Sequence, residues 1–179
     1  SDVTIQLNRY APNSDTAYIA TNGAFAGTFG PTATLAGAGR VFGAWNMGGT
    51  FAPGRDAGSR HNIDVAGSVS FQPAGILDTE IGGSSTFGQV TGSGTVALNG
   101  TLRVRLVSGF NPSPGQTFDV VSVTTRSNVF ADTDMDRFAE GPDRFYVSYP
   151  AGKVRLHARK CAADWNGDAF VNGDDYDSY

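Results

Sequence analysis

Cysteine is almost absent from this chain of 179 residues, since Cys161 is the only one. A single thiol excludes an internal disulfide framework. Lysine is scarce as well, because it occurs only at Lys153 and Lys160. No run of about eighteen apolar residues occurs, so the sequence predicts no membrane-spanning helix. What remains is a chain long enough for one sizeable core, or for one domain with an appendage.

Charge is distributed unevenly along the chain, although its net value is only −4. Residues 161–179 contain no Lys or Arg and five acids: Asp164, Asp168, Asp174, Asp175 and Asp177. Since the whole chain has 17 acids and 13 bases, residues 1–160 hold the other 12 acids and all 13 bases. This body is close to neutral and has no basic stripe, so no nucleic-acid partner is predicted.

The chain is rich in glycine, with 24 residues, and in patterns typical of strands. Because side chains alternate between the two faces of a strand, an alternating segment turns one apolar face to a core and one polar face to water. Such alternation occurs over residues 3–7, 62–65, 68–71, 76–81, 101–106, 117–120, 144–149 and 153–158. It predicts that the following charged residues lie on wet faces: Asp64, Asp78, Glu80, Arg103, Arg105, Asp119 and Arg155.

A short phrase led by glycine recurs in the chain. It occurs as Gly67-Ser-Val69-Ser-Phe71, Gly94-Thr-Val96-Ala-Leu98 and Gly100-Thr-Leu102-Arg-Val104. Turn signals also place a glycine about every twenty residues between positions 54 and 115. Self-similarity at this period is typical of a solenoid, in which each coil buries its face against its neighbours. A β-sandwich is the alternative, and the repeated phrase favours the solenoid.

The order of these segments resembles the passenger-type β-helix repeats of bacterial autotransporters and related secreted surface proteins. The resemblance covers residues 36–158 and rests on segments 49–54, 62–71, 77–82, 100–106 and 114–120. It implies an all-β fold, a right-handed parallel β-helix, and an extracellular structural role at the bacterial cell surface. We therefore expect a cap or strand-exchange segment over residues 1–35, a β-solenoid body over 36–160, and a separate C-terminal segment over 161–179.

The C-terminal segment contains a pattern that indicates Ca²⁺ binding. Oxygen-bearing side chains occupy positions 1, 3, 5, 9 and 12 of a loop, and position 7 supplies a backbone carbonyl. This is the EF-hand-type spacing, and Ca²⁺ takes roughly six to eight oxygen ligands. The predicted ligands are Asp164, Asn166, Asp168, Phe170 through its carbonyl, Asn172 and Asp175.

Residues 161–175 are similar to a dockerin repeat, a calcium-binding module that docks extracellular proteins onto partners. The resemblance implies a cohesin-like scaffold as a partner. Two positions depart from the EF-hand pattern: Ala169 stands at position 6 in place of Gly, and Asp175 at position 12 in place of Glu. A dockerin also has two such repeats, and this segment holds one. The alternative interpretation is an acidic, flexible tail.

Other candidate residues have weaker patterns. Asp132, Asp134 and Asp136 repeat the early calcium spacing, but Arg137 at position 6 favours a solvated surface loop. The only imidazoles, His61 and His157, have no Ser or Cys motif beside them, so no catalytic residue is predicted. Five aromatic residues are candidates for a sugar-stacking platform or an interface, against ordinary core packing: Tyr10, Tyr18, Trp45, Tyr146 and Tyr149.

These features predict a non-enzymatic extracellular structural or surface protein. In this hypothesis a β-solenoid subunit self-assembles into a fibre or surface layer, and Ca²⁺ orders its C-terminal segment. The first alternative is an adhesin module that binds a polysaccharide or cell surface and is docked through the tail. The second is a polysaccharide-cleaving β-helix enzyme, which two carboxylates or an Arg–Asp pair converging in one groove would favour.

Overall fold

Strands form all the regular structure in the described part of the chain. The computed structural model describes residues 4–7, 17–19, 26–55, 62–136 and 144–159, and every helix or strand within these ranges is a β-strand. The strands belong to two sheets and most of them pair in parallel. The predicted all-β class is confirmed. In the same part of the chain there is no helix long and apolar enough to cross a membrane.

The first sheet is parallel throughout. In spatial order it contains β1 (Thr4–Leu7), β4 (Thr34–Gly37), β7 (Thr50–Pro53), β10 (Ile76–Ile81), β12 (Thr101–Leu106) and β14 (Asp132–Met135). Thr50 pairs with Thr34, 16 positions earlier, and with Ile76, 26 positions later. The next steps, from Ile76 to Thr101 and from Thr101 to Asp132, are 25 and 31 positions. The chain thus returns beside its previous strand after each crossover connection.

The second sheet contains two parallel series that join at one long strand. The first series is β2 (Ala17–Ile19), β5 (Gly39–Val41), β8 (Asn62–Val65) and β11 (Gln89–Ala97). The second is β3 (Ala26–Phe29), β6 (Ala44–Met47) and β9 (Ser68–Phe71), which also leads to β11. The first three residues of β11 pair with β8 and the last three with β9, with a register shift between Gly92 and Thr95.

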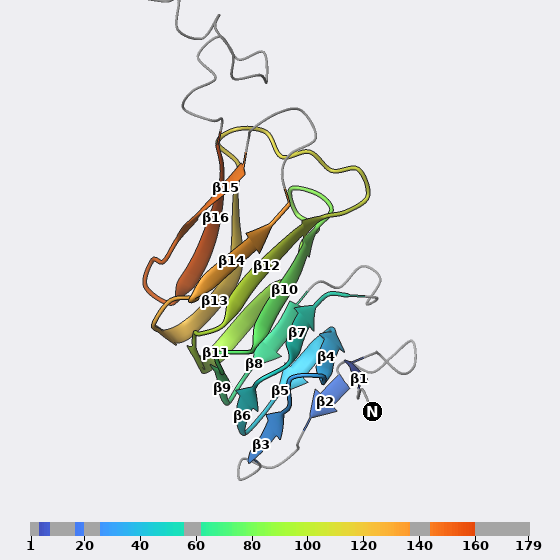
Figure 1. The fold of residues 1–179 in the computed structure, drawn as a ribbon, viewed down its shortest axis with the longest axis vertical. Coiled ribbons are helices and arrows are strands. Elements are labelled where there is room, and N and C mark those ends of the chain that lie inside the picture. The colour runs from blue at the N-terminus through green and yellow to red at the C-terminus, as the bar shows by residue number, and fades with distance from the viewer. Residues whose placement is uncertain (1–3, 8–16, 20–25, 56–61, 137–143, 160–179) are drawn as a thin grey trace, which may run out of the picture.

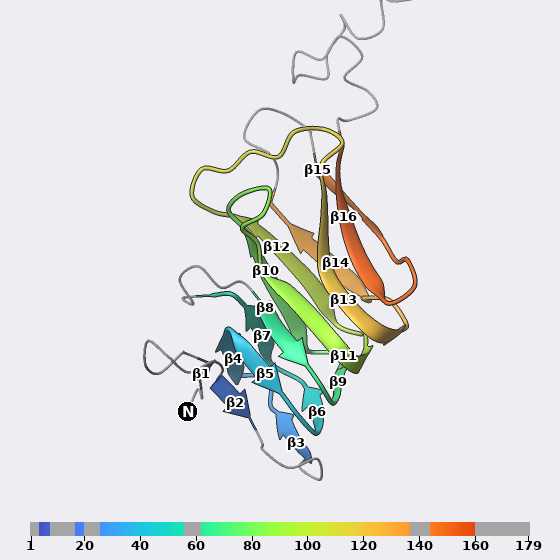
Figure 2. The same cartoon turned by 180° about the vertical axis from the view of Figure 1, so that it is seen from behind.

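An antiparallel hairpin ends the second sheet. β13 (Thr117–Ser127) lies parallel to β11, whereas β16 (Lys153–Arg159) runs antiparallel to β13, and β15 (Arg144–Ser148) runs antiparallel to β16. In both views the strands follow one another along the long axis, from β1–β3 at one end to β13–β16 at the other (Figures 1 and 2). The hairpin therefore covers the edge of the last parallel strand of this sheet.

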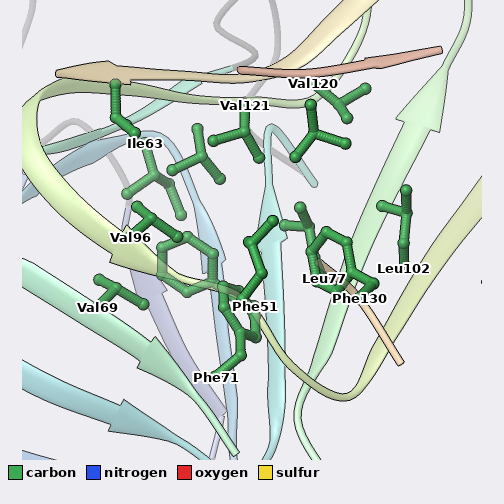
Figure 3. Close-up of a cluster of buried hydrophobic side chains, with 14 of the residues drawn as sticks. Phe51, Ile63, Val69, Phe71, Leu77, Val96, Leu102, Val120, Val121 and Phe130 are labelled. Atoms are coloured by element: carbon green, nitrogen blue, oxygen red, sulfur yellow. The ribbon is translucent and has the colours of Figure 1, made fainter. Parts of the chain in front are cut away.

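The core lies between the two sheets, whose inward side chains point toward one another (Figure 3). Leu77 and Leu102 come from the first sheet and Ile63 from the second, and all three are fully buried. Phe51 and Phe71 meet edge to face, with ring centroids 6.0 Å apart. Burying one such side chain contributes about 1.5–3 kcal/mol. The predicted segments 62–65, 68–71, 76–81 and 101–106 coincide with β8, β9, β10 and β12, because alternation fixes which side chains face this core.

Stacked glycines explain the repeated phrase. The N–H of Ser68 donates to the carbonyl of Gly43 at 2.7 Å, and the N–H of Thr95 donates to that of Gly67 at 2.9 Å. A Cβ on Gly67 would overlap the Gly43 backbone, and one on Gly94 would overlap the Gly67 carbonyl oxygen. The phrase therefore marks a corner where each passage of the chain lies directly on the previous one, an approach that requires glycine.

A second corner repeats this arrangement beside the first sheet. Ile76 donates its N–H to the Gly49 carbonyl, and Thr101 donates to the Gly75 carbonyl, both at 2.9 Å. A Cβ on Gly100 would overlap the Gly75 carbonyl oxygen. Two series of corner residues thus hold successive passages of the chain in one register.

The segment over residues 1–35, expected to be a cap or a strand-exchange segment, contains the described strands β1, β2 and β3. Within residues 1–35, β1, β2 and β3 pair in parallel with β4, β5 and β6 and extend the same strand series. Their role as a cap or an exchange segment stays a prediction. Residues 161–179 lie outside the described ranges. The surface loop predicted around Asp134 is wrong, because residues 132–135 form strand β14.

Candidate functional site

A ladder of alternating charges crosses the outward face of the first sheet. The register places Asp78 of β10 opposite Arg103 of β12, and Arg103 opposite Asp134 of β14. Leu77 and Thr79 on either side of Asp78 are fully buried, so strand alternation turns Asp78 away from the core. Acid, base and acid therefore follow one another on three neighbouring strands.

Asp78 is the centre of this ladder. Its Oδ1 accepts a hydrogen bond from Arg105 Nε at 2.9 Å, and its Oδ2 accepts bonds from Arg105 Nη2 at 3.1 Å and from Arg55 Nη2. Arg103 Nη1 lies 4.0 Å from Oδ2. Asp78 lies on the outward face as predicted, but that position is not wet, because the guanidinium groups leave it only 4% exposed.

The carboxylates next to Asp78 on this face also accept hydrogen bonds. Glu80 Oε1 accepts a bond from Arg105 Nη2 at 2.9 Å, and Asp134 Oδ2 accepts one from Arg103 Nε at 2.8 Å. Asp136 Oδ2 accepts the backbone N–H of Leu106 at 2.9 Å. Burial lowers the pKa of Arg105, but the hydrogen bond and charge of Asp78 and the charge of Glu80 outweigh it and raise that pKa. Arg105 is therefore held in its charged form beside these two carboxylates.

A hollow of about 440 Å³ opens over this ladder. It is lined by Arg55, Asp78, Arg103, Val104, Arg105, Asp134 and Asp136. Arginine and aspartate side chains thus converge here, which is the arrangement expected for the alternative of a polysaccharide-cleaving enzyme. Glycoside hydrolysis, however, needs one carboxylic acid that gives a proton and one free carboxylate. Here each carboxylate accepts hydrogen bonds from guanidinium or backbone N–H groups, so the arrangement is that of a salt-bridge network.

The acidic residues Asp132 and Asp134 lie on strand β14. Alternate residues on a strand lie about 6.6–6.8 Å apart, which spreads Asp132 and Asp134 along the sheet. Asp132 Oδ1 accepts the N–H of Thr133 at 2.7 Å, while Asp134 binds Arg103. Across the described ranges, no group of three or more His, Cys, Asp or Glu side chains is placed to hold a metal ion.

The predicted calcium ligands cannot be placed in the same way. All of them lie outside the described residues: Asp164, Asn166, Asp168, Phe170, Asn172 and Asp175. His61 lies outside them too. The calcium loop therefore stays a prediction from its spacing and from its resemblance to a dockerin repeat.

The hairpin at the end of the second sheet brings together a pair that the sequence did not indicate. Ser148 Oγ lies 2.7 Å from His157 Nε2, although the two residues are nine positions apart. Antiparallel pairing of β15 with β16 places them diagonally on one face. The sequence feature that could have indicated this pair is the turn Pro150-Ala151-Gly152, because a turn between two alternating segments is typical of a hairpin.

Asp119 of β13 anchors the same face. Its carboxylate accepts bonds from Arg155 Nε at 2.6 Å, Arg155 Nη2 at 3.0 Å and Lys153 Nζ at 2.7 Å. The hydrogen bonds from Arg155 and then Lys153 lower the pKa of Asp119 to about 2, against the opposing effect of its partial burial. The carboxylate is therefore ionised across the physiological pH range.

The aromatic candidates have different environments. Trp45 is 8% exposed and donates its Nε1–H to the Phe42 carbonyl, which excludes it as a platform. Tyr149 packs against the core, with the Arg126 guanidinium 5.4 Å from its ring centroid. Tyr146 is 55% exposed. Tyr10 lies outside the described residues, and for Tyr18 only the strand β2 is described.

No protein-family model matches the chain, and no curated protein matches it. The function is therefore inferred from the residues and contacts of the chain itself.

Proposed function

We propose that this chain is a non-enzymatic extracellular structural or surface protein whose body is a right-handed parallel β-solenoid. In this proposal the body self-assembles, and the C-terminal segment binds Ca²⁺. The observation that carries it is the regular return of the chain: each strand from β4 to β12 pairs in parallel with a strand of an earlier and of a later passage. A body of this kind is a stiff support.

Three features support the solenoid. The pairing steps of 16–31 positions give each passage its own strands in both sheets. The stacked corner glycines fix how far one passage lies from the next. Crossover connections between parallel strands of one sheet are right-handed in about 98% of cases, which favours the right hand.

The state of the charged groups favours a structural role over catalysis. Asp78, Glu80, Asp119 and Asp134 all form ion pairs with Arg or Lys. A carboxylate held in this way contributes to stability and to register along the sheet. It is poorly suited to exchange protons with a substrate.

The two ends of the described fold differ, and this difference suggests how copies assemble. Among the described strands, β1, β2 and β3 at one end pair on one side only, as do β14 and β15 at the other. An unpaired strand edge is a template for another chain. At the other end the β15–β16 hairpin covers β13, and β14 carries acidic residues. We therefore place the self-association surface at the N-terminal end.

Electron microscopy of the purified protein, with excess Ca²⁺ and with excess EDTA, tests the proposal. We expect fibres or sheets in Ca²⁺. In EDTA we expect looser assemblies, while the β-rich body of each subunit stays folded. Circular dichroism of the same samples shows whether the body stays folded. Dispersed monomers under both conditions would count against assembly, and intact assemblies in excess EDTA would remove Ca²⁺ from it.

The polysaccharide-cleaving enzyme is the second candidate, because Arg and Asp side chains do converge over β10, β12 and β14. To test it, acidic and neutral polysaccharides are incubated with the protein, and the formation of new reducing ends and of unsaturated products is measured. Product formation by the wild type that is lost in Arg105→Gln would establish the enzyme. If no polysaccharide is cleaved, the structural proposal stands.

A further inference from the structure

The outward face of the β15–β16 hairpin combines basic and aromatic side chains. Strand β16 alternates the buried residues Val154, Leu156 and Ala158 with Lys153, Arg155, His157 and Arg159. Positions two apart on a strand lie about 6.6–6.8 Å from each other, so these four side chains form a row along the sheet. Asp119 of the neighbouring β13 lies opposite Arg155 in this row.

Tyr146 stands beside this row on β15. The register places it opposite His157, whose ring centroid is 6.0 Å from that of Tyr146. The guanidinium of Arg159 lies 4.9 Å from the centroid of the Tyr146 ring. Tyr146 is 55% exposed, and within the described residues it is one of two large hydrophobic side chains with such exposure. An aromatic ring in water, flanked by an arginine, is the arrangement that ligand-binding surfaces use.

The charge of this face is opposite to that of the whole chain. Lys153, Arg155 and Arg159 contribute three positive charges and Asp119 one negative charge, whereas the chain has a net charge of −4. Asp119 holds Lys153 and Arg155 in place, so their charges are fixed in position on the sheet. The face is thus a local basic surface that attracts an anionic ligand.

We propose that this face, formed by Tyr146, Ser148, Lys153, Arg155, His157 and Arg159, binds an acidic polysaccharide, a chain of sugars that carry carboxylates. A tyrosine ring stacks on the apolar face of a sugar through its body and reaches water through its hydroxyl. A guanidinium presents two parallel N–H groups to a carboxylate. The Ser148 hydroxyl and the His157 imidazole supply the donors and acceptors that sugar hydroxyls require.

A nucleic acid fits the same face less well. Strong nucleic-acid binding rests on many phosphate contacts, about 6–10 in well-studied cases. The described side chains of this face include three cations and Asp119, a net charge of +2, and two of those cations are already bound to Asp119. One exposed ring beside one less engaged guanidinium matches a sugar carboxylate better than a row of phosphates.

Binding of a soluble uronic-acid polymer to the full chain, measured by affinity gel electrophoresis and titration calorimetry, tests the proposal. A neutral polysaccharide of similar length is the comparison ligand and is expected to bind at least about tenfold more weakly. Tyr146→Ala is expected to weaken polyuronate binding roughly 3- to 10-fold. Arg159→Gln is expected to weaken it about tenfold.

Arg40→Gln is the matched control, because it removes the same charge from strand β5, where Arg40 pairs with Asp64 at 2.8 Å. It is expected to bind polyuronate as the wild type does. Unfolding midpoints of all variants separate lost binding from lost folding, and Tyr146→Phe keeps the ring if Tyr146→Ala is unstable.

Equal affinity for the neutral polymer, or full affinity in Tyr146→Ala and Arg159→Gln, overturns the proposal. Equal or tighter binding of a single-stranded oligonucleotide with the same number of charges would assign the face to anions in general and also overturn it.

Discussion

Asp78 and Arg105 are bound diagonally across two parallel strands. The register pairs Asp78 with Arg103, yet both carboxylate oxygens of Asp78 accept hydrogen bonds from Arg105, at 2.9 and 3.1 Å. The diagonal leaves Arg103 Nε to bind Asp134 at 2.8 Å on the next strand. One diagonal pair thus links the three strands β10, β12 and β14 through a continuous network.

Asp78→Asn is expected to destabilise the protein by about 2–4 kcal/mol, because it leaves guanidinium groups around a buried site without their counter-charge. Urea unfolding at neutral pH gives the free energy of unfolding. Asp134→Asn is the matched control in the same ladder. Asp134 is 62% exposed and has one ion pair, so a loss below about 1 kcal/mol is expected. Equal losses in the two variants would contradict the central role of Asp78.

Gly67→Ala is expected to cost about 2 kcal/mol or more, since the added Cβ overlaps the Gly43 backbone and forces the corner apart. Gly30→Ala is the control, because a Cβ there has no atom within 4 Å. That variant is expected to change stability by less than about 1 kcal/mol, in the stabilising direction if at all. Thermal unfolding of the two variants measures the difference. A tolerated Gly67→Ala would mean that the corners are not close-packed.

Acid should weaken the contribution of Asp119 in a defined pH window. Hydrogen bonds from Arg155 and Lys153 lower the pKa of Asp119 from 3.8 to about 2. Because the folded pKa is the lower one, the stabilisation is complete above the unfolded value and is lost as pH falls through the folded value. Asp119→Asn is therefore expected to be about 1 kcal/mol less stable than the wild type at neutral pH, after allowance for solvent screening.

Urea unfolding of wild type and Asp119→Asn at several pH values between neutral and about 2 measures this difference. The gap between the two proteins should stay constant down to the unfolded pKa and then close. Asp64→Asn, which removes the partly exposed pair with Arg40, serves as the comparison variant. A gap that widens in acid would contradict the assigned direction of the shift.

The predicted calcium loop can be tested apart from the body. Asp164→Ala combined with Asp168→Ala should abolish the heat of Ca²⁺ binding in titration calorimetry, because Ca²⁺ requires a nearly full set of oxygen ligands. Unfolding of the β-rich body should be unchanged. Asp132→Ala combined with Asp134→Ala is the control for acidic charge and should leave Ca²⁺ binding intact. Loss of binding in that control instead would locate the ion at β14.

Where sequence patterns predicted strands well, the reason is local. In segments such as 62–65 and 101–106, each apolar residue faces the core and each polar residue faces out, so the pattern itself contains the burial. Residues 132–135 have no such pattern, since three of their four side chains are exposed. They form strand β14 because Thr101 to Val104 of β12 provide a paired edge. The formation of this strand depends on a partner about 31 positions earlier in the chain, so the local sequence alone does not predict it.

Local patterns were enough for the all-β class and for strands such as β8, β9, β10 and β12, because alternation is a property of a single segment. The recurring glycines were also visible, although the corners that they form were not. It also contains the calcium spacing, which stays a prediction. Three features needed the folded chain: the burial of Asp78 under arginine side chains, the contact of Ser148 with His157, and the exposure of Tyr146 beside Arg159. Each of these depends on which strands become neighbours, and pairing between distant segments is set by the packing of the whole sheet.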